Sequence, residues 1–350
     1  MITNKKALVI GGLGVTGSYI IKELMAQGGW EILGVARNKP EESSSTPFIS
    51  VDISERQACH EAMSGLKDIS HLFFTARNDK GDHQQQSTYN LAMLRNVVEA
   101  VDHSGNCLRH VHLMHGMKAY GNMLGEFKTP AEETDPRIPL PLTYYAQEDF
   151  VMEHQPLKDW TWSCLRPGGV VGLTLGYSGN IVSILAIYGS ICKYLGWPFW
   201  FPGTPEGFTV LRQVCNADLL AKAAIWVSTH DQCANKIFNV HNGDTFRWLH
   251  LWPHIARFFN LEPAGVINLK LLDLMKDKGP VWEKIVNDHN LRPLAFEKIV
   301  SWDYSQVFHN TWDSFSNSNR LYSSGFHERA DTLHSLLNYL QQMRYARIIP

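Results

Sequence analysis

The sequence predicts an α/β protein in which a doubly wound parallel sheet is joined to a smaller, mostly helical lobe. Three observations predict this fold class. Short β-branched runs alternate with helical patterns in the first half, a glycine-rich turn follows the first run, and aromatic and helical patterns dominate beyond about residue 174. Strands that alternate with helices imply right-handed crossovers and a parallel sheet that helices cover on both faces.

Six runs in the first half have the length and residue types of buried strands. They are residues 7–10, 31–36, 48–51, 71–74, 108–114 and 160–165. A helix is predicted between the fourth and fifth runs, because aliphatic residues recur there on one face: Leu91, Leu94, Val97, Val98 and Val101. A later run, residues 236–240, extends the predicted sheet, and helices are predicted over residues 281–290 and 331–342.

The 350 residues fit two domains of ordinary size. Residues 1–173 are predicted to form a nucleotide-binding core, to which the run at 236–240 returns. Residues 174–350 are predicted to form mainly a substrate-binding lobe. Aromatic residues crowd the start of this lobe, from Tyr177 to Phe201, and they are expected either to line an apolar pocket or to build a plain hydrophobic core.

The composition excludes several classes of protein. A hydrophobic fraction of 44% with 19% charged residues suffices for a packed core and excludes a disordered chain. The formal net charge of −2, with both signs interspersed, gives no electrostatic footprint for nucleic acid or for an anionic membrane. The expected partners are therefore small or weakly charged.

The cysteines and the apolar segments indicate a cytoplasmic protein. The six cysteines are scattered without a Cys-x-x-Cys pair, which is typical of free thiols in a reducing compartment. The N-terminal apolar run is too short for a signal peptide. The most apolar stretch, residues 181–191, has about half of the ~20 residues that a membrane-spanning helix needs.

The most informative motif is a glycine string directly after the first predicted strand. Gly11, Gly14 and Gly17 follow a strand and open a helix, which is the context of the phosphate-binding turn in Rossmann-type domains. Gly11 allows the tight turn, Gly14 the close approach of a pyrophosphate, and Gly17 the packing of helix on strand. The helix N-terminus supplies unpaired N–H groups for the phosphates, so a dinucleotide cofactor is predicted.

The residues after the second predicted strand favour NADP(H) over NAD(H). A site selective for NAD(H) usually has Asp or Glu at this place, whereas this chain has Ala36-Arg37-Asn38-Lys39. Arg37 can form a bidentate pair with the ribose 2′-phosphate. The alternative is that Arg37 and Lys39 are ordinary solvated loop cations. Asp52, after the third strand, fits either a hydrogen-bond acceptor for adenine or an ordinary turn residue.

The Tyr-x-x-x-Lys pair of simple short-chain dehydrogenases is absent from the chain. In its place stand Tyr144 and Tyr145, with Glu148 and Asp149 where a lysine would follow. The predicted substitute cation is Lys118, just beyond the fifth strand, at the edge where open α/β sheets bind ligands. A lysine near a phenol favours the phenolate and helps the hydroxyl to share charge with a developing oxyanion. Taken alone, Lys118 also fits a surface lysine, and the tyrosines also fit packing residues.

Further motifs extend over nearly the whole chain. Besides Tyr144-Tyr145-x-x-Glu148-Asp149 and the displaced Lys118, they are Arg166-Pro167-Gly168, Asn242-Gly243-Asp244 with Trp248 and Trp252, residues 269–286 with Pro280-Val281-Trp282-Glu283, and the terminal Ile348-Ile349-Pro350. With these motifs the chain resembles the progesterone 5β-reductase/iridoid synthase family of atypical short-chain reductases. The resemblance covers far more of the chain than the glycine string does.

The resemblance implies NADPH-dependent reduction of a carbon–carbon double bond conjugated to a carbonyl. The β-carbon accepts hydride, negative charge moves to the carbonyl oxygen as an enolate, and the α-carbon is then protonated. Tyr144, matched to the family's catalytic tyrosine, would donate a hydrogen bond to that oxygen, and Lys118 would support it electrostatically. Tyr145 would point about 100° away on a helix and is the alternative phenol.

The resemblance also implies the cofactor contacts. Together with Gly11 and Gly17, they are Leu13, Gly14 and Val15 at the pyrophosphate, and Arg37 and Asn38 at the 2′-phosphate. Beside adenine they are Asp52 and Ile53. Along the groove they are Thr75, Ala76, Met114 and Tyr144, and on the nicotinamide side Val170. Three positions depart from the family pattern, because Asn38 replaces an arginine, Ala76 a large aromatic residue and Met114 a polar residue. The substrates of the plant members are therefore not assumed for this chain.

Two other functions are compatible with the motifs. One is a carbonyl reductase or an epimerase/dehydratase on the same scaffold, against which the missing Tyr-x-x-x-Lys counts. The other is a non-catalytic NADP-sensing regulator, against which the retention of Lys118 and Tyr144 counts. The expected substrate is a small apolar enone or enal, and the family suggests a homodimer. Zinc is not expected, since no Cys, Asp or Glu joins His110, His112 and His115 at ligand spacing.

Overall fold

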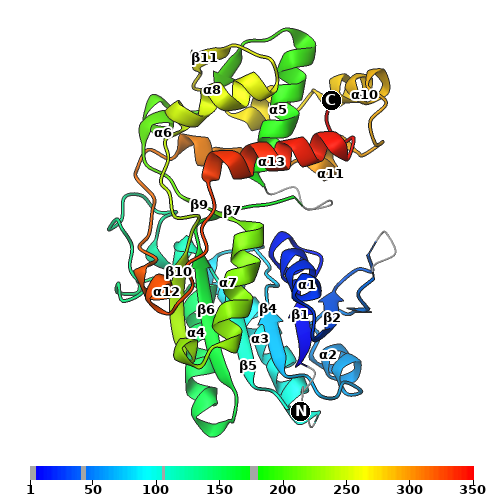
Figure 1. Ribbon diagram of the computed structural model, residues 1–350, viewed down its shortest axis with the longest axis vertical. Coiled ribbons are helices and arrows are strands. Elements are labelled where there is room, and N and C mark those ends of the chain that lie inside the picture. The colour runs from blue at the N-terminus through cyan, green and yellow to red at the C-terminus, as the bar shows by residue number, and fades with distance from the viewer. Residues whose placement is uncertain (1–4, 41–44, 105–106, 174–179) are drawn as a thin grey trace.

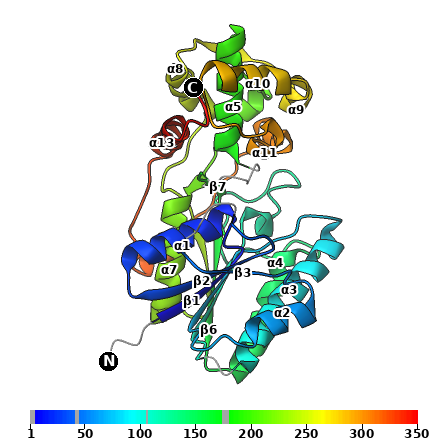
Figure 2. The ribbon, with the colours of Figure 1, turned by 90° about the vertical axis from the view of Figure 1, so that its right-hand side faces the viewer.

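The computed structural model describes residues 5–40, 45–104, 107–173 and 180–350, which form the two parts visible in Figures 1 and 2. The larger part contains a seven-stranded sheet between two layers of helices. The smaller part is mostly helical, lies beyond one end of the strands and carries the C-terminus. The predicted fold class is confirmed.

The seven strands of the sheet lie within a few residues of the runs predicted for them. They are β1 (Lys5–Ile10), β2 (Trp30–Ala36), β3 (Phe48–Ser50), β4 (His71–Phe74), β5 (His110–Met114), β6 (Thr161–Pro167) and β10 (Lys236–Val240). All neighbouring pairs are parallel, in the order β10-β6-β5-β4-β1-β2-β3. The late strand β10 pairs with β6 at the edge and so extends the sheet.

Helices cover both faces of this sheet, as Figure 2 shows. On one face α1 (Val15–Gln27) lies beside α7 (Ala217–Thr229), and on the other lie α2 (Arg56–Met63), α3 (His83–His103) and α4 (Thr143–His154). Because both faces are covered, a central strand is buried at successive positions, and all four residues of β4 are buried. The long α3 begins with a capping box, in which the side chains of Asp82 and Gln85 each bond to the other's backbone N–H.

The smaller part is built from short helices and one parallel pair of strands, β8 with β11. Its elements are α5 (Ile181–Leu195), β8 (Phe199–Phe201), α6 (Pro205–Thr209), α8 (Trp248–Phe258), β11 (Pro263–Val266), α9 (Leu271–Met275), α10 (Gly279–Asp288), α11 (Phe296–Ile299) and α13 (Thr332–Tyr345). The remaining short helix, α12 (Asn319–Ser323), contacts β10 of the sheet instead. Residues beyond 174 therefore contribute to both parts of the molecule.

Aromatic side chains form the core of the smaller part. The rings of Phe199 and Trp252 stack with centroids 4.4 Å apart, Tyr188 stacks on the same phenylalanine at 5.2 Å, and all three side chains are buried. The Trp252 indole N–H donates to the Phe199 carbonyl at 3.0 Å. The aromatic run from Tyr177 to Phe201 was expected either to line a pocket or to build a plain core. Tyr188 and Phe199 belong to a plain core, and Tyr177 lies outside the described residues.

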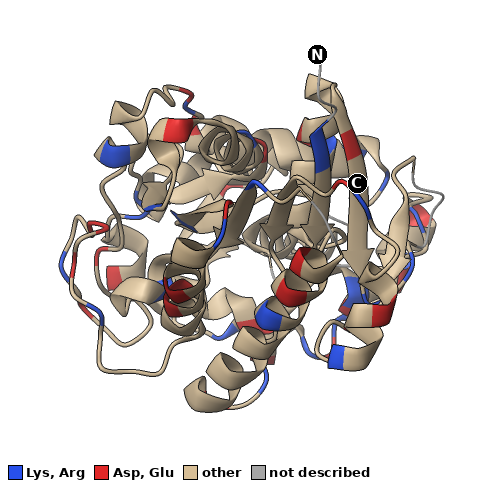
Figure 3. Cartoon of the chain, turned by 90° about the horizontal axis from the view of Figure 1, so that it is seen from below, with Lys and Arg blue, Asp and Glu red and all other residues tan. Residues whose placement is uncertain are grey.

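Charge and hydropathy at the surface match the composition. Seen from below in Figure 3, basic and acidic residues are interspersed over the helices and loops. Among the described residues, no helix combines the length and the apolar character needed to cross a membrane.

The order of the strands reverses between β1 and β4. From β1 the chain proceeds outward to β2 and β3, and then it returns to β4 on the other side of β1 and continues to β5 and β6. The connections from β1 and β4 therefore leave toward opposite faces and open a crevice at the carboxyl ends of these two strands. Open α/β sheets bind their ligands at such a switch point.

Candidate active site

The glycine turn after β1 packs tightly against its own chain at two positions. Gly11 has φ +80°, and a Cβ at this position would lie 2.8 Å from Thr75 Oγ1 and 2.9 Å from the nitrogen of Ala76. A Cβ on Gly17 would overlap the Gly11 carbonyl, because α1 packs directly on the turn. Only glycine fits these two positions without a shift of the backbone.

The N-terminus of α1 is open toward the crevice. The residue before the helix, Gly14, is its N-cap and has no side chain to cap the first N–H groups. Leu13 and Val15 flank this position and are partly exposed. Unpaired N–H groups and the positive end of the helix dipole favour an anion, so this cradle fits the pyrophosphate of a dinucleotide.

The residues predicted for the adenine end follow β2 and β3. Arg37 and Asn38 are exposed, and the Ser50 hydroxyl donates to the Arg37 carbonyl at 2.8 Å. Asp52 Oδ1 accepts hydrogen bonds from the hydroxyl and the backbone N–H of Ser54, at 2.7 and 3.0 Å. These bonds and the nearby Arg37 charge lower the pKa of Asp52. The Asp52 carboxylate therefore already has a turn-forming role.

The other predicted cofactor residues differ in burial. Ile53 is 5% exposed and belongs to the hydrophobic core under α2 and α3. Thr75 and Ala76 follow β4 at the switch point, where the Thr75 hydroxyl donates to the last carbonyl of β1 at 2.7 Å. Met114 ends β5 and is partly buried. Val170 lies in the short strand β7 (Gly169–Val171), which pairs with β9 (Val214–Asn216) between the two parts of the molecule.

Tyr144 lies at the start of α4 and is buried, with 5% of its surface exposed. Its hydroxyl accepts a hydrogen bond of 2.7 Å from Nη1 of Arg77, a residue of the loop after β4. The ring of His115 stacks on the tyrosine ring at 4.5 Å with an interplanar angle of 16°. A Cβ on Gly116 would lie 3.4 Å from the tyrosine oxygen, so this glycine leaves room around the hydroxyl.

Lys118 lies on the turn of 3-10 helix that follows β5 (Met117–Tyr120) and its side chain is exposed. Partial burial of the ammonium group and the Arg77 charge lower the pKa of Lys118, and the Asp79 charge opposes this shift. Within the described ranges, the Lys118 side chain makes no hydrogen bond or ion pair, and the direct contact to the Tyr144 hydroxyl comes from Arg77 instead. The pairing of Lys118 with the phenol thus stays a prediction.

The neighbouring Tyr145 has a different environment. Its hydroxyl donates to the Ala119 carbonyl at 2.7 Å and accepts from the Ile138 N–H at 3.0 Å. Burial raises the pKa of this phenol. Both hydrogen-bonding directions of Tyr145 are therefore occupied by the backbone, which leaves Tyr144 as the phenol that can turn its proton toward a ligand.

Glu148 occupies the helix position where Tyr-x-x-x-Lys would place its lysine. The carboxylate is 1% exposed and accepts from Arg166 at 2.6 Å and from Arg137 at 3.2 Å. Burial opposes its ionisation, whereas the hydrogen bond from His115 and the Arg166 charge favour it and lower the pKa of Glu148 to about 2. An anion at this position cannot anchor a ribose as the lysine of the simple motif does.

Comparison with known proteins identifies the family of this chain. The sequence model of the PRISE-like Rossmann-fold domain matches residues 52–350. The (S)-8-oxocitronellyl enol synthase of Catharanthus roseus is 31% identical over 361 residues, which cover 98% of this chain and 92% of the plant protein. The 3-oxo-Δ(4,5)-steroid 5β-reductase of Arabidopsis thaliana is 30% identical over 363 residues, with coverages of 98% and 93%.

The chain belongs to the PRISE-like Rossmann-fold family. The resemblance to the 5β-reductase/iridoid synthase family that the motifs indicated is thereby confirmed.

Solved structures support the fold of this PRISE-like protein. UDP-glucose 4-epimerase of Thermotoga maritima aligns with a TM-score of 0.69 at 15% identity and covers 97% of this chain and 99% of its own. A short-chain dehydrogenase/reductase protein of Agrobacterium tumefaciens with bound NAD also aligns with a TM-score of 0.69, at 14% identity and 98% coverage of both chains. At this identity the similarity concerns the fold alone.

The sequence patterns did not identify Arg77, although it contacts the phenol directly. The available signal was its position three residues after β4, at the ligand-binding edge of the sheet. The pairing of Glu148 with Arg166 was also missed, although both residues belong to recognised motifs. Each of these contacts joins residues far apart in the sequence, so no local pattern reports it.

The histidines are arranged differently from a metal site. His110 and His112 both bond to the Ser163 hydroxyl, at 2.7 and 2.9 Å. His115 instead lies with Glu148 and Cys164, and ligand atoms of these three residues are within 4.8 Å of one another. Because two arginines already neutralise the carboxylate and burial raises the pKa of the Cys164 thiol, this cluster has the chemistry of a buried ion-pair network.

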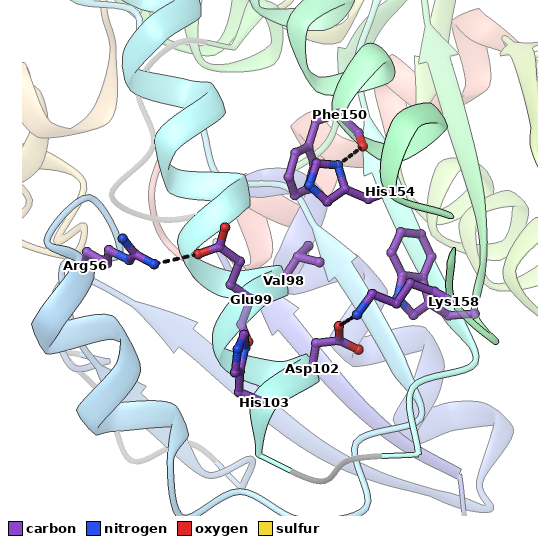
Figure 4. A pocket seen from close by; sticks show the side chains of 9 residues that line it. Arg56, Val98, Glu99, Asp102, His103, Phe150, His154 and Lys158 are labelled. Atoms are coloured by element: carbon purple, nitrogen blue, oxygen red, sulfur yellow. Dashed lines mark hydrogen bonds and ion pairs between the residues drawn. The ribbon is translucent and has the colours of Figure 1, made fainter. Parts of the chain in front are cut away.

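A surface pocket of about 300 Å³ lies away from the crevice (Figure 4). It is located at the C-terminal ends of α3 and α4. Because these helices run antiparallel to the strands, their C-terminal ends lie at the amino ends of the strands, opposite to the switch point. Charged residues on its walls pair with each other, Arg56 with Glu99 and Lys158 with Asp102. It is therefore no part of the candidate active site.

Proposed function

We propose that this protein reduces the activated carbon–carbon double bond of an α,β-unsaturated ketone or aldehyde with NADPH. The observation that carries the proposal is the buried Tyr144 hydroxyl, held by Arg77 at the ligand-binding edge of the sheet, in a chain about 30% identical over its full length to a named 5β-reductase. Relatives named enol synthases support the same chemistry, because an enol is what forms when the β-carbon of an enal gains hydride.

The nucleotide would be held by residues that fit it. Gly11, Gly14 and Gly17 supply the cradle for the pyrophosphate. Arg37, with Asn38 beside it, supplies the guanidinium for a 2′-phosphate, and no acidic side chain stands at that place to select NAD(H). When bound, NADPH supplies the hydride for the β-carbon.

Tyr144 would act on the carbonyl end of the substrate. Its O–H donates to the carbonyl oxygen, and this hydrogen bond strengthens as negative charge moves there from the double bond. The exposed Lys118 ammonium at the same edge supplies a positive charge that stabilises the enolate. The α-carbon then takes a proton, and the saturated carbonyl compound leaves.

The alternatives receive less support from the site. A carbonyl reductase or an epimerase of the usual type uses a lysine four residues after the tyrosine, and here that position holds Glu148, paired with Arg166. The epimerases among the structural neighbours share only the fold at 15% identity. A regulator that senses NADP(H) would not require a phenol held by a cation.

The test is a product analysis with NADPH and a panel of cyclic enones, enals and steroid enones. The expected product is the saturated ketone or aldehyde, with deuterium from labelled NADPH on the β-carbon. An allylic alcohol with deuterium on the carbonyl carbon would establish carbonyl reduction instead. Tight NADPH binding without turnover of any acceptor, together with no effect of Tyr144→Phe on that binding, would support the regulator.

A further inference from the structure

We propose that Arg77 is a positioning residue for this reaction: its guanidinium holds the Tyr144 hydroxyl so that the phenol proton faces the substrate oxygen, and its charge supports the negative charge that develops there. The inference rests on the proposed function of Tyr144. It goes beyond the tyrosine and lysine of the family motif, because Arg77 belongs to no motif of the sequence and reaches the phenol from another element.

The donor and acceptor roles at the phenol define its orientation. The guanidinium can only donate, so in the 2.7 Å contact the tyrosine oxygen is the acceptor. The hydroxyl proton of Tyr144 therefore points away from Arg77. A phenol oriented in this way is a ready donor for a carbonyl oxygen in the crevice. The Arg77 Cζ atom also lies 5.5 Å from the centroid of the tyrosine ring.

The guanidinium is itself held in place. Its Nη2 pairs with the Asp79 carboxylate, so that Nη1 remains directed at the phenol. The loop is fixed by Asn90 of α3, whose side chain accepts from the Asn78 N–H and donates to the Asn78 carbonyl, both at 2.8 Å. Two backbone bonds on the residue next to Arg77 restrict where its side chain can reach.

The same network connects this loop to the helix of Tyr144. The Gln147 side chain, one turn after the tyrosine on α4, donates to the Asn90 carbonyl at 3.1 Å. Its oxygen then faces Nε2 of His115 at 3.1 Å, and the His115 ring stacks on Tyr144. The loop after β4, helix α3 and helix α4 thus hold Arg77 and Tyr144 at a fixed separation, as a catalytic pair requires.

The charges around the phenol identify Arg77 as the cation in direct contact. Burial raises the pKa of Tyr144, the Arg77 and Arg166 charges lower it, and Asp79 and Cys164 raise it. Arg166 is committed to Glu148 at 2.6 Å, and Lys118 makes no contact with the phenol in the described part of the chain. Removal of the Arg77 charge should therefore weaken the phenol as an acid.

The first experiment compares Arg77→Met, Arg77→Lys and the matched control Arg95→Met, with NADPH and an enone that the wild type reduces. Arg95 is an exposed residue of α3 outside the site. We expect Arg77→Met to lower kcat by about 10- to 100-fold, the worth of a hydrogen bond to a charged group. Arg77→Lys should recover part of that loss, and Arg95→Met should match the wild type. The dissociation constant of NADPH should stay unchanged in all three variants.

A double-mutant cycle with Tyr144→Phe then separates a role through the tyrosine from a direct one. If Arg77 acts through the phenol, Arg77→Met should cost less than about twofold in kcat once the hydroxyl is gone. An equal loss in both backgrounds would overturn the inference and indicate that Arg77 binds an anionic group of the substrate. A loss confined to NADPH affinity would also overturn it and assign Arg77 to the cofactor phosphates.

A titration without substrate keeps this inference distinct from the proposed function. The ultraviolet absorbance of tyrosinate, as the difference between each protein and its Tyr144→Phe counterpart, reports ionisation of this phenol. We expect Arg77→Met to move it to higher pH, because the nearby cation stabilises the phenolate. No movement would overturn the role of Arg77 even if enones are reduced. A shift in a protein that reduces no enone would leave the Arg77–Tyr144 coupling intact and refute the proposed function alone.

Discussion

At the residue scale, two adjacent tyrosines with identical side chains have different surroundings. Successive residues of a helix point about 100° apart, so Tyr144 and Tyr145 face different neighbours. The Tyr144 hydroxyl meets a guanidinium at the crevice, whereas the Tyr145 hydroxyl bridges the Ala119 carbonyl and the Ile138 N–H. The first arrangement suits chemistry, and the second joins the start of α4 to the segment before it.

These surroundings predict opposite phenotypes for the two phenylalanine variants. Tyr144→Phe should lower kcat by about 10²- to 10³-fold, the usual effect of removing one donor to a developing oxyanion. Tyr145→Phe should leave kcat near the wild-type value but lower the free energy of unfolding by about 1–3 kcal/mol, because it leaves a buried carbonyl and a part-buried N–H without their partner. Steady-state kinetics and urea unfolding of both variants check this. The reverse pattern would make Tyr145 the catalytic phenol.

Arg37 gives a second prediction at this scale. Arg37→Ala should raise the dissociation constant of NADPH by about 10- to 100-fold, because it removes a charge-assisted contact to the 2′-phosphate, and should hardly change that of NADH. The control Arg257→Ala removes an equal charge from an exposed position on α8, in the smaller part. Titrations of both variants with NADPH and NADH measure these dissociation constants. If Arg37→Ala lost the same affinity for both nucleotides, Arg37 would not select the nucleotide.

At the element scale, α4 joins the candidate site to a buried ion-pair network. One turn after Tyr144 the helix places Glu148 against Arg166 of β6 and Arg137 of the preceding segment. Arg137 also pairs with Asp149 at 2.6 Å, so both acids of the Glu-Asp motif have a structural partner. The helix that presents the phenol is therefore held to the sheet by charge as well as by packing.

Removal of the central carboxylate should be costly. Glu148→Gln leaves the buried Arg166 guanidinium without its counter-charge, and we expect the free energy of unfolding to fall by about 3–5 kcal/mol. The matched control Glu153→Gln alters an exposed residue of the same helix and should change stability by less than about 0.5 kcal/mol. Urea unfolding of both variants measures the difference. Equal small effects would show that the network contributes little to stability.

The elements were largely predictable from the sequence, and the contacts between them were not. The seven strands follow short, mostly apolar runs whose composition and length are local properties, so residues 71–74 and 236–240 were placed correctly as strands. The contact of Arg77 with Tyr144 joins residues 67 positions apart, and it depends on how far the loop after β4 reaches toward α4. That distance is set by tertiary packing, which includes the Asn90 bonds to the loop, and no periodicity encodes it.

At the scale of the whole molecule, buried histidines link the stability of the sheet to pH. His71 and His110 are opposite each other on β4 and β5, and His112 follows on the same face of β5. All three side chains are buried inside the sheet, with exposed fractions of 5%, 4% and 0%. Burial lowers the pKa of His71 to about 4 and that of His112 to about 3, and it lowers that of His110 well below its usual value.

These shifts predict a steep loss of stability in acid. Each histidine is neutral in the fold but gains a proton in the unfolded chain below about pH 6.5, so the unfolded state binds more protons as the pH falls. Stability should be full above this pH and decline as the pH falls toward about 4. At about 1.4 kcal/mol each per pH unit, these three protons should contribute about 4 kcal/mol per pH unit to the slope near pH 5.

Urea unfolding at a series of pH values between about 8 and 5 measures this slope. His112→Gln should reduce it by about 1.4 kcal/mol per pH unit, whatever its effect on stability at high pH, because one titrating group is lost. His254→Gln, at an exposed position on α8, should leave the slope unchanged. If His112→Gln also leaves it unchanged, the acid sensitivity resides elsewhere, and the buried histidines contribute to the sheet only through packing and their hydrogen bonds.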